Sequence, residues 1–149
     1  MSEAAASGGP RWLPGFRGTC FIVAGLYVVL GAAIVAQGAA LAMAPYGVPA
    51  QTLASPHYAD AIHWLYSHTI VLGLIIGLVG ALAESERLKL WFSRLILAAQ
   101  LYFLYLDVRH SDTALGNGLY EGPQSIVPAI IGLFVTLLFL RLSLPGTRR

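Results

Sequence analysis

The sequence predicts an all-α membrane protein, folded as an up-down bundle of four transmembrane helices with both termini in the cytoplasm. Four long apolar stretches, at about residues 19–44, 62–83, 88–106 and 125–144, carry this prediction. A bilayer core about 30 Å thick requires about 20 apolar residues of helix, and each stretch has roughly that length. Charged residues make up 11% of the chain, whereas a soluble domain carries about 25%.

The first apolar stretch, residues 19–44, follows a segment rich in Ala, Gly, Ser and Pro. We expect residues 1–14 to form a disordered tail, and residues 15–149 to form a single four-span domain. The small residues Ala40, Ala42 and Ala44 also resemble a signal-peptide cleavage site, so removal of this stretch stays open as an alternative. Because a signal peptide has an apolar core of only about 7–15 residues, we favour a retained first span.

The second and third stretches are joined by the short segment 84–89. We therefore expect these two spans to be antiparallel neighbours whose outer ends meet. Small residues recur every fourth position in spans one and two, a spacing that suits close packing between membrane helices. They would pack within the bundle, against a second copy or against another membrane subunit; they are Ala32, Ala36 and Ala40 in span one, and Gly73, Gly77 and Ala81 in span two.

The basic residues predict the orientation. Eight of the nine lie before span one, around the connection between spans two and three, or near the end of the chain, and Arg109 alone lies on the other side. The positive-inside rule then places both termini in the cytoplasm. We expect a multi-pass protein of a bacterial cytoplasmic (inner) membrane. Its partners would be the lipid bilayer and other membrane subunits or its own copies, whereas the absence of a basic patch excludes nucleic acid.

The residues able to carry chemistry gather at the outer end. All four histidines of the chain fall there, and a polar line follows span three at seven-residue spacing through Ser93, Gln100 and Asp107. Polar side chains within a span usually face the bundle interior. The sequence therefore predicts a polar pocket that opens outward, built from His63, His68, Gln100, Asp107 and His110.

Four residues of this pocket are candidate ligands for a metal ion or haem: His63, His68, Asp107 and His110. His63 and His68 are five residues apart, about 140° around a helix, so they cannot both reach one ion without distortion. Asp60 and His63 can share a face. No HExxH or similar motif strengthens the metal prediction, and the histidines could instead form hydrogen bonds at the membrane surface.

The functional prediction follows from these observations. The sequence contains no reactive constellation, whereas small residues suited to helix contacts are abundant. We expect a small integral membrane protein that acts as an accessory or interaction subunit, or as a small-molecule-binding four-helix bundle. The alternative is a metal- or haem-dependent membrane redox enzyme with an outward-facing His/Asp site, and whether the protein is an enzyme stays open.

Overall fold

The computed structural model describes residues 13–111 and 126–144, whose regular structure is entirely helical. Four helices are long, namely α1 (Phe16–Gln37), α4 (Pro56–Leu82), α5 (Glu86–Ser111) and α6 (Ile126–Ser143). Three of them, α1, α4 and α6, are long and apolar enough to cross a membrane. The predicted all-α membrane class is therefore confirmed at this level.

Helix α5 is comparable in length to the other long helices but is not apolar enough to qualify as a membrane span. Arg87 and Lys89 lie in its first turn, Arg94 and Gln100 follow further along, and Asp107 lies near its end. These side chains lower its mean hydropathy although the helix has 26 residues, about 39 Å at 1.5 Å per residue. A crossing by α5, and with it the four-span bundle, stays a prediction.

Helix α1 ends earlier than the apolar stretch 19–44 suggests. Gly38 adopts a φ of 79°, a backbone conformation that suits glycine and interrupts the helix, and its N–H still bonds to the Ile34 carbonyl at 3.1 Å. The chain continues as the short helix α2 (Ala39–Met43), a 3-10 turn at Ala44–Tyr46 and the short helix α3 (Ala50–Leu53). The expected first span is thus one long helix followed by short ones.

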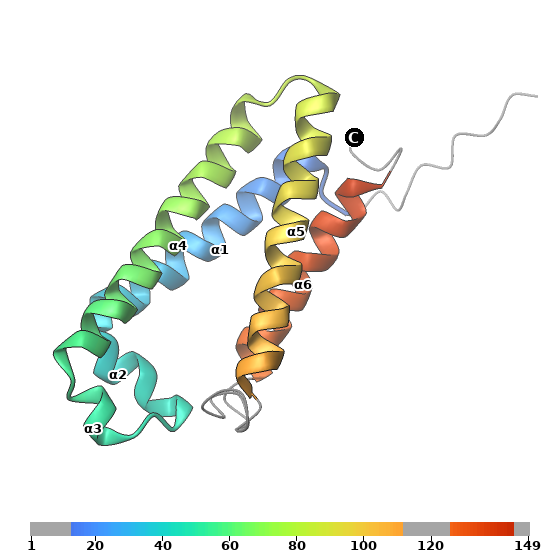
Figure 1. The fold of residues 1–149 in the computed structure, drawn as a ribbon. Coiled ribbons are helices and arrows are strands. Elements are labelled where there is room, and N and C mark those ends of the chain that lie inside the picture. The colour runs from blue at the N-terminus through green and yellow to red at the C-terminus, as the bar shows by residue number, and fades with distance from the viewer. Residues whose placement is uncertain (1–12, 112–125, 145–149) are drawn as a thin grey trace, which may run out of the picture.

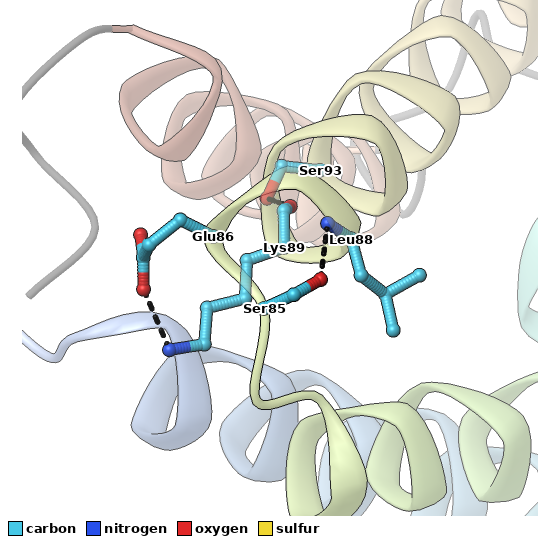
Figure 2. A network of polar contacts seen from close by, with 5 residues as sticks. All are labelled: Ser85, Glu86, Leu88, Lys89 and Ser93. Atoms are coloured by element: carbon cyan, nitrogen blue, oxygen red, sulfur yellow. Dashed lines mark hydrogen bonds and ion pairs between the residues drawn. The ribbon is translucent and has the colours of Figure 1, made fainter.

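Helix α4 begins at Pro56, ahead of the apolar stretch that starts near Ile62. Proline is favoured in the first helical turn, where its missing N–H costs no hydrogen bond. The helix has 27 residues, about 40 Å, so it is longer than the hydrocarbon core of a bilayer. Helix α5 starts after Ser85, whose Oγ accepts the Leu88 N–H at 3.1 Å and caps the helix (Figure 2).

The four long helices form two pairs, with α1 packed along α4 and α5 packed along α6 (Figure 1). The pairs meet near the connection between α4 and α5, which we call the closed end of the molecule. They diverge toward the opposite end, the open end, where α2 and α3 lie (Figure 1). Helices α4 and α5 are therefore adjacent only where they are joined.

The buried core lies at the closed end. It contains the first turns of α1, the second half of α4, the start of α5 and the second half of α6, through Phe16, Cys20, Val23, Ile76, Ile96, Val135, Leu138, Phe139 and Leu142. The rings of Phe16 and Phe92 meet edge to face, with centroids 6.3 Å apart. The two helix pairs are thus held together at one end.

Glycines allow α1 and α4 to approach closely. A Cβ built on Gly80 would overlap the Cβ of Cys20, and one on Gly73 would lie 3.1 Å from the Ala24 carbonyl oxygen. Gly31 makes the matching approach from α1, where a Cβ would lie 2.9 Å from the Tyr66 carbonyl oxygen. Gly73 and Gly77 of the predicted span-two series therefore pack against α1, whereas Ala32, Ala36 and Ala40 of the predicted span-one series are exposed.

Candidate functional site

The five residues of the predicted outer pocket lie on two helices that separate. His63 and His68 belong to α4, and Gln100, Asp107 and His110 belong to α5. Figure 1 shows the open ends of α4 and α5 well apart, so the structure does not bring the two histidines of α4 to Asp107. The side chain of His110 lies outside the described residues. The pocket stays a prediction.

His68 bonds within its own helix. Its Nδ1–H donates to the Trp64 carbonyl oxygen at 2.8 Å, and its ring lies against the Trp64 ring, with centroids 4.7 Å apart. Both side chains are exposed, and together with Asp60 they line a hollow of about 500 Å³ on the outward face of α4. The bond satisfies one ring nitrogen at a depth where an unpaired polar group is costly.

His63 lies on another side of α4. With Asp60 it lines a small cavity of about 200 Å³ against the end of α1, where Gly38 and Ala39 form the break between α1 and α2. Asp60 and His63 therefore share a face, as their three-residue spacing predicts. The different surroundings of His63 and His68 agree with the 140° between them on a helix.

A metal or haem site finds no further support in the described parts of the chain. Within residues 13–111 and 126–144, no three His, Cys, Asp or Glu side chains lie close enough together to hold a metal ion. His63, His68, Asp107 and His110 therefore remain candidate ligands on the sequence argument alone.

Two of the three residues in the polar line on α5 face the interior, and the third, Asp107, is half-buried. Ser93 is fully buried and Gln100 is 5% exposed. The Ser93 hydroxyl donates to the Lys89 carbonyl at 2.7 Å, and Gln100 Nε2 donates to the Tyr27 hydroxyl at 2.6 Å. The Gln100–Tyr27 hydrogen bond joins α5 to α1, so it links the two helix pairs between the closed end and the open end.

The sequence analysis did not identify Tyr27 as the partner of Gln100. Tyr27 is half-buried in the middle of α1. A signal was present in the sequence, because Tyr27 carries the only hydroxyl between Cys20 and Gln37. A buried tyrosine hydroxyl usually has a hydrogen-bond partner, and Gln100 is the polar residue at similar depth on α5.

An apolar wedge separates the two pairs on one side of the molecule. It has a volume of about 560 Å³ and lies between α1 and α6, lined by Phe21, Gly25 and Val29 on α1 and by Ile130 and Phe134 on α6, among others. Its walls carry no charged side chain. Both helices that form the wedge are long and apolar enough to cross a membrane.

The closed end carries a polar network instead. Lys89 Nζ bonds to Glu86 Oε1 at 2.8 Å, next to the capping residue Ser85 and to Ser93 on α5 (Figure 2). Arg94 lies over the Trp91 ring, with its guanidinium carbon 5.4 Å from the ring centroid. Arg17, on the first turn of α1, donates to the Ala81 carbonyl at 3.3 Å. Charged side chains from α1 and α5 therefore gather where the pairs meet.

Comparisons of the chain with protein-family models, with curated proteins and with solved structures found no match.

Proposed function

We propose that this protein is a small multi-pass protein of a bacterial inner membrane that acts as an accessory or interaction subunit of a membrane assembly. All four long helices would cross the bilayer, with the closed end in the cytoplasm. Five of the six basic residues in the described segments support this orientation, since Arg17, Arg87, Lys89, Arg94 and Arg141 lie toward the closed end and Arg109 toward the other.

The uncovered small-residue face of α1 carries the proposal. Gly25, Ala32 and Ala36 are exposed, and they share one face of the helix because they are seven and four residues apart. A Cβ built on Gly25 meets nothing within 4 Å. Contact with lipid tails does not require small side chains, whereas close packing against another helix does.

The wedge extends this uncovered face. Gly25 and Val29 belong both to the exposed face of α1 and to the wall of the wedge, and α6 provides the opposite wall. A helix from a second subunit or a second copy could therefore pack on α1 and contact α6 at the same time. Such a contact would bury apolar surface from both helix pairs and hold their open halves in a fixed arrangement.

The experiment compares two substitutions of equal size. Ala32→Leu adds bulk to the uncovered face of α1, and Ala98→Leu adds the same bulk at an exposed position of α5 away from the wedge. The wild-type protein, purified in mild detergent, should migrate with another chain or as a dimer, and Ala32→Leu alone should release the partner. A wild-type protein that is strictly monomeric and brings no other chain would contradict the proposal.

A further inference from the structure

The closed end contains a polar hollow of about 570 Å³ that the subunit proposal does not use. It lies where the first turn of α1, the last turn of α4 and the first turn of α5 converge. Gly15, Gly18 and Gly80 form part of its wall. Its volume lies within the range of about 300–1,000 Å³ that small-molecule sites occupy.

Two cations face this hollow from different helices. Arg17 uses one guanidinium N–H for the Ala81 carbonyl, and a guanidinium has five N–H donors in a planar fork. Lys89 bonds to Glu86, and its side chain is only 21% exposed, so its ammonium is held in place at the wall of the hollow. An ammonium has three N–H donors, and the bond to Glu86 occupies one of them. Both side chains can therefore donate to an anionic group.

Glu84 gives the hollow a charge of the opposite sign. It lies in the connection between α4 and α5, which forms part of the wall, and its side chain is exposed. A purely anionic ligand would be attracted by Arg17 and Lys89 and repelled by Glu84. A ligand that carries both an anionic group and a hydrogen-bonding cation would match all three side chains.

The position of the hollow along the helices limits the source of such a ligand. It lies at the start of α1 and the end of α4, two helices that are long and apolar enough to cross a membrane, so it is level with the lipid headgroups. Trp91, exposed nearby on α5 beneath Arg94, is a residue type enriched at that depth. Basic pockets between membrane helices are known binding sites for lipid phosphates.

We propose that this hollow binds the headgroup of a phospholipid that carries a phosphate and a primary ammonium, as in phosphatidylethanolamine. Arg17 and Lys89 donate to the phosphate oxygens, where a guanidinium fits by its geometry and an ammonium by its charge. Glu84 accepts a hydrogen bond from the lipid ammonium. Phosphatidylcholine offers the same phosphate, but its quaternary nitrogen has no N–H to donate.

The experiment measures lipid binding to the purified full-length protein by native mass spectrometry. Phosphatidylethanolamine, phosphatidylcholine and phosphatidylglycerol with identical acyl chains are titrated separately. We expect phosphatidylethanolamine to bind at least tenfold more tightly than the other two lipids. Equal affinity for all three lipids would overturn the proposal, and so would a soluble glycerophosphoethanolamine that binds as tightly as the lipid, because it would assign the hollow to free phosphate esters.

The variants separate the hollow from the general charge of the closed end. Arg17→Gln should lower the affinity for phosphatidylethanolamine about tenfold, whereas Arg94→Gln, which removes a cation held over Trp91 outside the hollow, should leave it unchanged. Equal losses in both variants would mean general attraction between the basic end and lipid, and would overturn the specific site.

Glu84→Gln keeps the inference testable if Arg17→Gln fails to fold. This exposed substitution should reduce the preference for phosphatidylethanolamine over phosphatidylcholine to less than threefold, while binding of phosphatidylglycerol holds or improves. An unchanged preference would remove Glu84 from the site and overturn the proposal. Neither Arg17 nor Glu84 belongs to the small-residue face formed by Gly25, Ala32 and Ala36, so the release of a partner by Ala32→Leu is an independent result.

Discussion

The closed end and the open end of this molecule differ in how closely the two helix pairs pack against each other. At the closed end all four long helices contribute to one buried core, which includes Phe16, Ile76, Ile96 and Phe139. Toward the open end the two helix pairs diverge, and an apolar wedge lies between α1 and α6 (Figure 1). The difference teaches that the packing that joins the pairs is concentrated at one end of the molecule, while the other end leaves apolar surface uncovered.

Two phenylalanines on α6 test this difference most strongly. Phe139 is fully buried in the core, whereas Phe134 lines the wedge and is 47% exposed. Because lipid is as apolar as the protein interior, Phe139→Ala loses packing rather than transfer energy. A cavity of roughly 100 Å³ at about 24 cal/mol per Å³ then costs about 2.4 kcal/mol.

Phe134→Ala is the matched control, since it widens a gap that already exists. Its effect should stay below about 0.5 kcal/mol, as for other exposed positions. Unfolding in mixed micelles with increasing dodecyl sulfate, followed by loss of helical circular dichroism, gives both free energies. Similar losses for the two variants would mean that the wedge is packed, and would remove the contrast between the ends.

Two glycines on the α1–α4 pair sharpen the contrast. Gly80 touches Cys20 so closely that a Cβ would overlap, whereas a Cβ on Gly25 meets nothing within 4 Å. Gly80→Val should therefore cost about 2 kcal/mol, within the roughly 1–3 kcal/mol typical of overpacking. Gly25→Val should change the free energy of unfolding by less than about 0.5 kcal/mol.

The Gly80 result has an internal check. Cys20→Gly removes the Cβ that a side chain at position 80 would meet. Gly80→Ala should therefore lower the free energy of unfolding less in the Cys20→Gly background than in the wild-type protein. Additive effects of the two substitutions in the same unfolding assay would show that the two positions are not in contact.

The smallest expected effect concerns the hydrogen bond between Gln100 and Tyr27, which joins the pairs toward the middle of the molecule. Hydrogen bonds between membrane helices contribute about 0.6 kcal/mol on average. A double-mutant cycle with Gln100→Leu and Tyr27→Phe should therefore give a coupling energy of about 0.6 kcal/mol. A coupling energy near zero would mean that this hydrogen bond does not stabilise the contact between the pairs, and that the core at the closed end alone connects them.

The sequence predicted the helical membrane class because long apolar stretches report directly on the solvent of a helix. The sequence could not predict whether the small residues of a helix pack within the molecule or lie on its surface. Gly73 packs against α1, while Ala32, with similar spacing, is exposed. The periodicity of one helix does not specify its partner.

The candidate site was less predictable than the fold, for a related reason. The short connection at residues 84–89 indicated that α4 and α5 are neighbours, but a tight turn fixes their separation only near the turn. The helices diverge beyond the turn (Figure 1), so the open end of α4, which carries His63, does not pack against the open end of α5, which carries Asp107. The predicted line through Ser93 and Gln100 did face inward, because a buried polar group in a span must find a partner.

The most direct test of the account asks what lies against the exposed face of α1 in the membrane. A benzophenone is attached at Ala32→Cys in a Cys20→Ala background, which removes the single native cysteine, and the same label at Ala98→Cys on α5 is the control. In membranes of the cell that makes the protein, irradiation should yield a discrete protein product of higher mass from position 32 and none from position 98. Lipid adducts alone at position 32, or equal protein products at both positions, would contradict the account.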